Sequence, residues 1–502
     1  MMLRPNVGDH TLRFTQPRQA PKACLVSFVG RLARWRLARC SLVNSATKNS
    51  STVEPISDRS QTVAYCQPPK LILLALAAIA VASYWVTGRV NAEDWPQWRG
   101  PGRDGVWHVD GLITELPEGQ MPLVWSKEIG SGYSGPTVAD GKVYVMDRTA
   151  TNERVICLDS ATGNEVWIHS YPAEYTVSYK AGPRASVTLD HGKAYAVGSM
   201  GYFHCFNAAT GEVLWKRDLN AEYNIQMPIW GIASSPLIYQ QTVILQVSGA
   251  DGACMVAFNQ ADGQEVWRSL NERAGYSSPI VIQQADQDVL VCWTGESLSG
   301  LDPKTGKVHW AHPMLPRNMP IGIVTPCYDR ERVFVSSFYD GSLMIRTPKD
   351  QLTSSVVWRA IGTDEQNTAS LHSMIGTPIV DGEHIYGVDS YGEFRCLNAA
   401  TGERIWEDLT AVPKSRWSTI HMVKQANTNT VWMFNERGEL LIANLSPKGL
   451  KIIDRCQLIE PTKAQLPQRG GVCWSHPAFA EKSIFIRNDN RIVRASLAKS
   501  AN

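Results

Sequence analysis

Aromatic and cationic side chains recur just ahead of eight copies of a short strand motif. The six with the most binding chemistry are Arg184, Trp230, His372, Trp417, Trp474 and His476. They belong to a wider set that also contains Tyr133, Lys180, Tyr276 and Thr325. Aromatic faces beside cations can hold a flat or anionic ligand. We therefore predict a shared binding site from the six residues, and the alternative is that large side chains simply fill the space there.

The common catalytic signatures are missing from the sequence. There is no Gly-rich phosphate loop with its Lys, no His-Glu-x-x-His pair and no Gly-x-Ser-x-Gly elbow. We therefore assign no catalytic residue and no metal site, and whether the chain is an enzyme stays open.

The chain repeats a turn that ends in Trp. It reads "CFNAATGEVLW" from Cys205 to Trp215 and "CLNAATGERIW" from Cys396 to Trp406. Related copies end at Trp167, Trp267 and Trp310, one without the Gly ends at Trp358, Ile453 replaces the Trp in another, and Trp125 has no turn before it. The steps between these positions are 42 to 52 residues, a period typical of propeller blades or helical arrays.

Short runs of alternating apolar and polar residues favour propeller blades over helical arrays, because this alternation is typical of β-strands. Each period contains four such runs separated by turn residues, and no segment after residue 100 shows a helical period over ten residues. The first-strand motif occurs eight times, as "SGPTV", "RASV", "SSPLI", "SSPIV", "VTPCY", "GTPIV", "STIHMV" and "SHPAF". The last repeat lacks a fourth strand, and residues 122–129 are a fourth strand without a third. We predict an all-β, eight-bladed β-propeller whose last blade joins residues 491–498 to residues 122–129.

The Asp/Asn-x-x-Thr-Gly-x-x-x-Trp turn, repeated over residues 122–498, resembles the PQQ-like repeat family. That family holds the quinoprotein alcohol dehydrogenases and the propeller scaffold of the bacterial outer-membrane assembly machinery. The stretch "DWPQWRGPGRDG" from Asp94 to Gly105 is similar to the opening of secreted bacterial members. The resemblance implies that each repeated Trp locks its blade to the next. Cys157, Cys205 and Cys396 share one repeat position and are predicted to be small core residues, with a metal or redox site as the alternative.

In the dehydrogenases of that family, PQQ lies between an aromatic ring and a vicinal disulfide, with calcium bound by carboxylates and amides. This sequence has neither a Cys-Cys pair nor a Cys-x-x-Cys-His haem site. We assign no cofactor and keep PQQ with calcium as an alternative that the resemblance implies.

The residues before the propeller predict export. Residues 1–70 form a basic leader, disordered or translated from a start annotated too early. The apolar run at 71–86 and the small residues up to Ala92 predict a signal peptide within 71–92, with a retained membrane anchor as the alternative. Residues 93–121 form an N-terminal latch and residues 122–498 the propeller. We expect a periplasmic or secreted protein, anchored to the membrane only if 71–86 is kept.

The charge of the chain argues against one class of partner, and its cysteine spacing argues against disulfides. Residues 1–92 hold 12 of the 49 basic and 3 of the 47 acidic residues, which leaves 37 basic and 44 acidic residues and a net charge of −7. A mildly acidic body without a basic stripe argues against a nucleic-acid partner. The eight cysteines of this body are irregularly spaced and predict no disulfide framework.

Three functions fit the sequence. The first is an exported, monomeric, non-catalytic propeller that acts as a binding or scaffold module, with a protein, small-molecule or glycan ligand at the channel rim. The second is a PQQ-dependent oxidoreductase of alcohols or sugars, and the third is a glycan-binding propeller.

Overall fold

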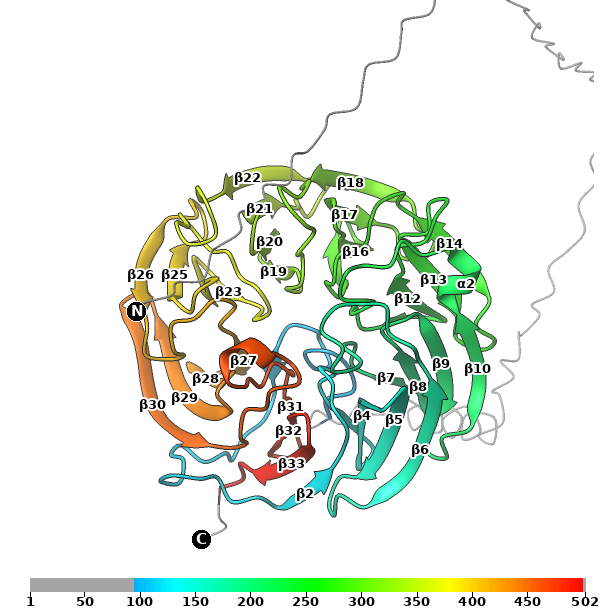
Figure 1. Ribbon diagram of the computed structural model, residues 1–502. Helices are drawn as coiled ribbons and strands as arrows, with labels where there is room; N and C mark the ends of the chain where they lie inside the picture. Colours follow the sequence, from blue (N-terminus) through cyan, green and yellow to red (C-terminus); the bar gives the residue numbers. More distant parts are fainter. Residues whose placement is uncertain (1–93, 500–502) are drawn as a thin grey trace, which may run out of the picture. The chain divides into compact units, whose positions relative to one another are not determined.

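Eight blades of four antiparallel strands stand in a ring, and one blade carries a fifth, parallel strand (Figure 1). This computed structural model describes residues 94–499, and the leader and signal peptide expected within 1–92 lie outside that range. The only helical segments described are α2 (Leu219–Tyr223) and the 3₁₀ turn η1 (Pro467–Arg469). The predicted all-β, eight-bladed propeller is confirmed.

Each blade is written here from its inner to its outer strand. Blade 1 has β3 (Thr137–Ala139), β4 (Lys142–Thr149), β5 (Asn152–Asp159) and β6 (Glu165–Pro172); blade 2 has β7 (Thr188–Asp190), β8 (Lys193–Val197), β9 (Tyr202–Asn207) and β10 (Val213–Asp218). Blade 3 has β11 (Leu237–Tyr239), β12 (Thr242–Gln246), β13 (Met255–Asn259) and β14 (Glu265–Ser269); blade 4 has β15 (Ile280–Gln284), β16 (Gln287–Trp293), β17 (Ser297–Leu301) and β18 (Val308–Pro313).

The second half of the ring follows the same order. Blade 5 has β19 (Cys327–Asp329), β20 (Arg332–Ser337), β21 (Gly341–Arg346) and β22 (Ser355–Ala360); blade 6 has β23 (Ile379–Asp381), β24 (His384–Val388), β25 (Phe394–Asn398) and β26 (Arg404–Asp408). Blade 7 has β27 (Ile420–Gln425), β28 (Thr430–Asn435), β29 (Glu439–Ser446) and β30 (Gly449–Gln457); blade 8 has β31 (Ala478–Ala480), β32 (Ser483–Arg487), β33 (Arg491–Ser496) and β2 (Trp125–Glu128).

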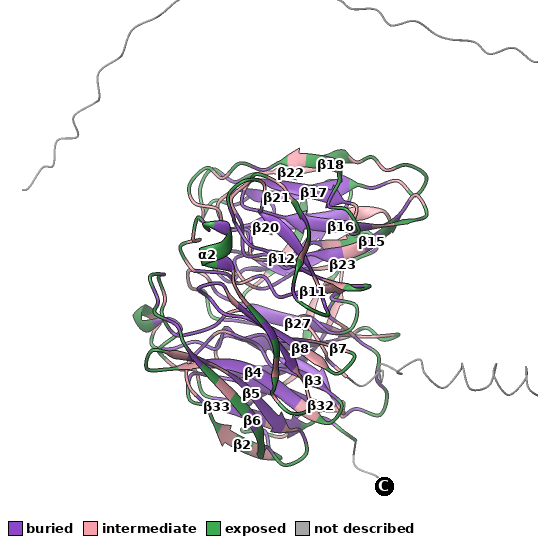
Figure 2. Cartoon of the chain, turned by 90° about the vertical axis from the view of Figure 1, so that its right-hand side faces the viewer, coloured by how far each residue is buried: buried purple, intermediate pink, exposed green. Residues whose placement is uncertain are grey.

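The inner strands are short because of the residue that precedes them. In six blades a proline stands directly before the first paired residue, as Pro136 does before β3 and Pro477 before β31. Proline has no N–H to donate, so the ladder begins only after it. The loop ahead of each proline is left free to line the channel. The second and third strands are buried between neighbouring blades, and the exposed residues gather on outer strands such as β6 and β18 (Figure 2).

The predicted closure of the ring is confirmed. Strand β2 pairs antiparallel with β33, with Trp125 opposite Arg494 and Glu128 opposite Arg491. Strand β33 also pairs along its other edge with β32. Blade 8 is therefore built from both ends of the described chain.

The repeated tryptophans dock on the following blade. The indole N–H of Trp167 donates to the carbonyl of Ala208 at 2.9 Å, and the ring lies over Gly211 of the next Thr-Gly turn, where a Cβ would meet ring atoms at 2.6 Å. Trp125, Trp215, Trp267 and Trp358 repeat both contacts with the blade that follows each of them. The Gly of each turn is thus the receiving surface for the preceding Trp.

Trp406 makes the hydrogen bond alone, to the carbonyl of Ser446 at 3.0 Å, and Trp310 makes neither contact. Blade 5 has no Thr-Gly turn to receive it, and its indole N–H donates instead to the side-chain oxygen of Gln284 within blade 4, at 3.0 Å. The ring is nevertheless buried in one apolar cluster with Val333 of blade 5, so the missing Gly changes the hydrogen-bond partner and not the packing between the two blades.

The segment before the propeller runs through the channel. Trp95 pairs with β3, the Arg103 guanidinium donates to carbonyls ahead of β11, and the Trp98 indole N–H donates to Thr325 ahead of β19. Strand β1 (Val106–Trp107) then lies parallel to β27. In Figure 1 this segment, drawn in blue, passes near the centre of the ring. Residues 94–107 therefore contact blades 1, 3, 5 and 7.

The cysteines of residues 94–499 are free thiols, and all but Cys327 are buried. Burial raises the pKa of Cys157 to about 12 and that of Cys205 and Cys396 to about 11. These thiols stay protonated and pack as small core side chains. No helix within residues 94–499 is long and apolar enough to cross a membrane.

Candidate functional site

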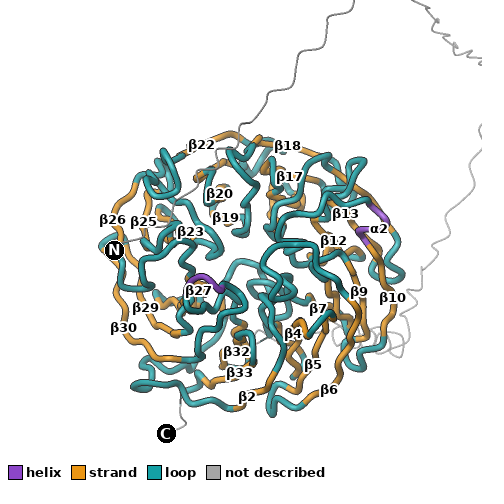
Figure 3. The backbone as a smooth tube through the Cα atoms, viewed as in Figure 1, coloured by secondary structure: helices purple, strands orange, loops and turns teal. Residues whose placement is uncertain are grey.

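All eight blades contribute to one cavity of about 130 Å³ in the channel. The loops that lead into the inner strands supply its walls, and these loops crowd the centre of the ring in Figure 3. The lining residues are Trp98, Tyr133, Tyr179, Arg184, Trp230, Ala233, Tyr276, Ser278, Ile323, Met374, Ile375, Trp417, Trp474 and His476. Most of this surface is aromatic or aliphatic.

Five of the six residues predicted from the sequence line this cavity. They are Arg184, Trp230, Trp417, Trp474 and His476, from blades 2, 3, 7 and 8. Equivalent positions in successive blades face one axis, which is why a position relative to the strand motif identified them. Their role in binding a ligand stays a prediction.

His372 does not line the cavity. Its side chain is fully buried between blades 5 and 6, where Nδ1 contacts the carbonyl of Phe338 at 2.9 Å and Nε2 accepts from the N–H of Gly362 at 3.0 Å. Burial lowers its pKa, so the ring is neutral at pH 7. Met374 and Ile375 take the place in the cavity that we expected for His372.

The guanidinium of Arg184 is committed to the protein itself. It donates to the carbonyls of Gly182 (2.6 Å), Ser178 (2.9 Å) and Tyr179 (2.7 Å) and to the hydroxyl of Ser199 (3.0 Å). Burial lowers its pKa, and within residues 94–499 no carboxylate forms an ion pair with it. These four hydrogen bonds hold the loop ahead of blade 2 and leave little capacity for a ligand.

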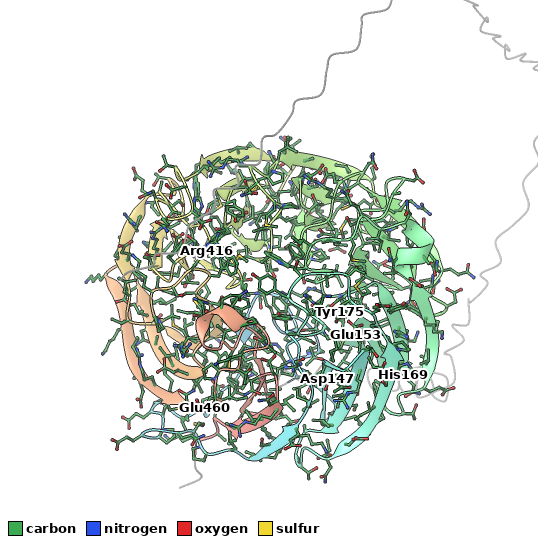
Figure 4. The ribbon with its side chains drawn as sticks, viewed as in Figure 1. Asp147, Glu153, His169, Tyr175, Arg416 and Glu460 are labelled. Atoms are coloured by element: carbon green, nitrogen blue, oxygen red, sulfur yellow. The ribbon has the colours of Figure 1, made fainter. Side chains whose placement is uncertain are left out.

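The buried carboxylate of Glu153 is linked to Arg184 through Ser199. Glu153 is fully buried and accepts from the hydroxyl groups of Tyr171 and Tyr175 and from the backbone N–H of Ser199. Figure 4 shows the labelled Glu153 and Tyr175 side by side. Because Ser199 contacts both Glu153 and Arg184, this network fixes the cation without a direct ion pair.

Replacing Arg184 with Ala should destabilise the fold. Three carbonyls and a hydroxyl would lose a charged donor, and we expect the free energy of unfolding to fall by about 2 kcal/mol. Denaturant unfolding of Arg184→Ala measures this. The control is Arg404→Ala, which removes an exposed ion pair with Glu407 and should cost less than about 0.5 kcal/mol. An unchanged stability of Arg184→Ala would contradict the structural role and favour Arg184 as a ligand donor.

The aromatic rings of the cavity form a connected series. Trp230 packs against Tyr276 with ring centroids 5.0 Å apart, and Tyr179 meets both Trp230 and Trp417 edge to face at 6.3 Å. Trp417 meets Trp474 at 6.5 Å. Edge-to-face contacts hold such rings in fixed orientations, so the walls of the cavity are rigid.

Two of these residues have an unfavourable backbone conformation. Tyr179 has φ of 55° and Trp417 has φ of 67°, the left-handed region that bulky residues rarely adopt. Each costs of order 1–3 kcal/mol, and such residues cluster at functional sites. The same conformation occurs at turn residues such as Asp140 and Arg330, so it marks tight turns in this fold and does not by itself favour binding over filling.

Some polar side-chain atoms around the cavity have hydrogen-bond partners and others have none. The Trp474 indole N–H donates to the Glu436 carboxylate at 3.1 Å, whereas the buried indole N–H of Trp417 and Nε2 of His476 have no partner within residues 94–499. Burial lowers the pKa of His476 well below its usual value, so its ring is neutral. His421 is also buried, and its Nε2 contacts the carbonyl of Trp474 at 2.9 Å.

Several residues that line the cavity were not predicted from the sequence. Ala233, Ile323, Met374 and Ile375 stand in the same loops as the predicted residues, but their apolar side chains carry no signal of chemistry. Trp98 comes from the non-repeating N-terminal segment, and no repeat rule places it in the channel. The density of Trp and Arg in "DWPQWRGPGRDG" was the available signal that this segment is buried.

The cavity does not fit PQQ with calcium. Calcium takes six to eight oxygen ligands, chiefly carboxylates and amides, and the lining contains no Asp, Glu, Asn or Gln. No group of three or more metal-binding side chains occurs within residues 94–499. The only cationic lining residue, Arg184, is already hydrogen-bonded to carbonyls. We therefore derive no reaction step through this cofactor.

Comparison with known proteins gives relatives of two kinds. The outer membrane protein assembly factor BamB of Shewanella oneidensis is 24% identical over 270 residues, which cover 50% of this chain and 67% of that protein. The quinohemoprotein alcohol dehydrogenase of Comamonas testosteroni is 24% identical over 204 residues, covering 38% of this chain but 28% of the dehydrogenase.

Solved structures of both kinds share the fold. BamB from Moraxella catarrhalis superposes with a TM-score of 0.53 at 14% identity, over 76% of this chain and 99% of that one. The Comamonas testosteroni dehydrogenase gives 0.55 at 14% identity, over 85% of this chain and 84% of that one. The family described as outer membrane protein assembly factor BamB matches residues 107–169 and 171–408, more than half of the sequence. The chain therefore belongs to this family of PQQ-like repeat β-propellers.

Proposed function

We propose that this chain is an exported propeller that acts as a binding or scaffold module and binds a protein at the mouth of the central cavity. The observation that carries the proposal is the cavity itself, which is lined by a loop from every blade and is almost wholly aromatic or aliphatic. A preformed apolar pocket at the axis of a rigid scaffold is a common binding site.

Exposed apolar residues in the loops that form the cavity support a protein partner. Ile229, Leu315 and Ile361 are exposed large apolar residues, and each lies in a loop that leads from an outer strand to the next inner strand, as most of the cavity residues do. Exposed apolar residues around a pocket are typical of protein interfaces. A small ligand inside the cavity would leave them uncovered.

The relatives support the same proposal. The match to the Shewanella oneidensis assembly factor covers 67% of that protein, whereas the match to the Comamonas testosteroni dehydrogenase covers 28%. A PQQ-dependent oxidoreductase is the second candidate, because that relative shares the fold. A glycan-binding propeller is disfavoured, since the lining has few polar side chains to pair with sugar hydroxyls.

The proposal includes the location of the protein. We propose that 71–92 is a signal peptide or membrane anchor, with cleavage after Ala92, and that the propeller acts in the periplasm or outside the cell. N-terminal sequencing of the exported protein tests the cleavage.

Site-specific photo-crosslinking in the producing cells tests the binding face. A photo-reactive amino acid at Ile229 should give a discrete adduct with one envelope protein, and the same group at Val266 on outer strand β14 should not. The two side chains are matched in exposure, at 46% and 49%. Equal labelling from both positions, or none from Ile229, would contradict a partner at the mouth. Tight calorimetric binding of PQQ with calcium, together with dye-linked alcohol oxidation, would favour the dehydrogenase instead.

A further inference from the structure

We propose that the cavity binds one uncharged aromatic side chain presented by an extended segment of a polypeptide partner. This inference rests on the proposed function and names the chemical group that the binding face recognises.

The size of the cavity fits one ring. A buried apolar cavity of about 150 Å³ accommodates benzene, and this cavity measures about 130 Å³. A single phenyl or phenol ring matches it.

The chemistry of the lining selects an uncharged ring. The four indoles of Trp98, Trp230, Trp417 and Trp474 face the cavity together with three tyrosines. Their edges and faces favour another aromatic ring. No carboxylate lines the cavity to attract a cation. The one guanidinium, on Arg184, already donates hydrogen bonds to backbone carbonyls. A carboxylate would lose its hydration there without gaining a free cation as a partner.

The mouth offers a polar contact suited to a peptide backbone. The indole N–H of Trp230, which is partly exposed, has no hydrogen-bond partner within residues 94–499. Its neighbour Tyr276 accepts from the backbone N–H of Trp230 through its hydroxyl oxygen, which leaves the hydroxyl hydrogen for an acceptor outside. Both groups donate, so they suit the carbonyl oxygens of an extended chain.

The rim indicates that the ring belongs to a polypeptide and is not a free small molecule. Ile229 directly precedes Trp230, and Leu315 lies in the same loop as Ile323 of the cavity wall. Met319 of that loop also packs with Trp230 and Trp417 in one apolar cluster. Residues flanking an inserted side chain would cover this rim, as interface residues surround a central anchor.

Calorimetry with short peptides tests the inference on the exported chain. The probe is the pentapeptide acetyl-Ala-Ala-Phe-Ala-Ala-amide. It should bind at least about tenfold more tightly than its all-alanine analogue, because a phenyl group is buried. Replacement of the phenylalanine by para-carboxyphenylalanine should abolish that gain. The pentapeptide should also bind more tightly than free toluene.

A cavity-filling variant supplies the site control. Ala233→Phe places a ring in the cavity from the loop of blade 3 and should abolish the gain from phenylalanine without lowering the melting temperature. Ala311→Phe adds the same side chain at an exposed position on outer strand β18 and should change nothing. If Ala233→Phe does not fold, Ile323→Trp fills the same cavity from the loop of blade 5.

Three results would overturn the inference. They are equal binding of the phenylalanine and alanine peptides, unchanged binding in the filled variant, and toluene binding as tightly as the peptide. A failed peptide experiment combined with a specific crosslink from Ile229 would reject the aromatic anchor alone. Failure of both would reject the proposed function as well.

Discussion

A chain that ends at Asn490 should not fold into a soluble propeller. The deletion removes β33, which is the only strand linking β2 to β32 in blade 8. Ile492, Val493 and Ala495 on this strand are fully buried. Loss of each buried aliphatic side chain costs about 1–4 kcal/mol, and both edges of the ring would be left unpaired. Together with the lost strand pairing, this loss is comparable with the 5–15 kcal/mol by which a typical domain is stable.

The soluble fraction after expression and the thermal melt by circular dichroism measure this result. The matched control ends at Lys499 and removes only residues 500–502, so it should melt as the full chain does. Unpaired strand edges promote aggregation, and we expect the shorter chain in the insoluble fraction. A soluble truncation with a cooperative melt would contradict closure through β2 and β33.

The fold could be predicted from the sequence because the repeated turn determines both the size of a blade and the number of blades. The spacing of the Trp copies gives the size of a blade, and the leftover strands at the two ends give the closure. The receiving surface for each Trp was harder to recognise, although the Gly that receives it stands in the same repeated turn. Docking joins the Trp of one copy to the Gly of the next, and this pairing becomes visible only when the ring is built.

The candidate site could be predicted only in part. Position relative to the inner strands placed Arg184, Trp230, Trp417, Trp474 and His476 at one axis. The same rule failed for His372, because its loop packs between two blades and its ring is held by backbone groups of blade 5 and the loop that follows it. It also could not distinguish a free cation from one used in structure, since the hydrogen bonds of Arg184 go to carbonyls of its own loop.

The position of the N-terminal segment in the channel could not be predicted from the repeats. Trp98 enters the cavity from residues that belong to no blade, and its position depends on contacts with blades far apart in the sequence. Periodicity carries no information about such a segment. Its composition suggested burial, but only the assembled ring defines where it is buried.

Replacement of Trp215 by Ala should lower the free energy of unfolding by about 3–5 kcal/mol. The ring is 8% exposed, its N–H donates to the carbonyl of Gln260 at 3.1 Å, and its face covers Gly263 in the next blade. Denaturant unfolding measures the change. Leu214→Ala on the same strand is the control, because Leu214 is exposed and should contribute less than about 1 kcal/mol. A loss below about 1 kcal/mol at Trp215 would contradict docking between blades.

The receiving glycine tests the same contact from the other side. A Cβ at Gly263 would lie 2.7 Å from the Trp215 ring, whereas Gly192 has a similar φ, 76° against 71°, and open space where its Cβ would lie. Gly192→Ala therefore measures backbone strain alone, about 1 kcal/mol, and Gly263→Ala should cost more because the indole must move. In the Trp215→Ala background this extra cost should vanish, since the two residues interact directly. Equal costs for Gly263→Ala in both backgrounds would show that the Trp does not rest on the turn, and the blades would then be held together by their buried strands alone.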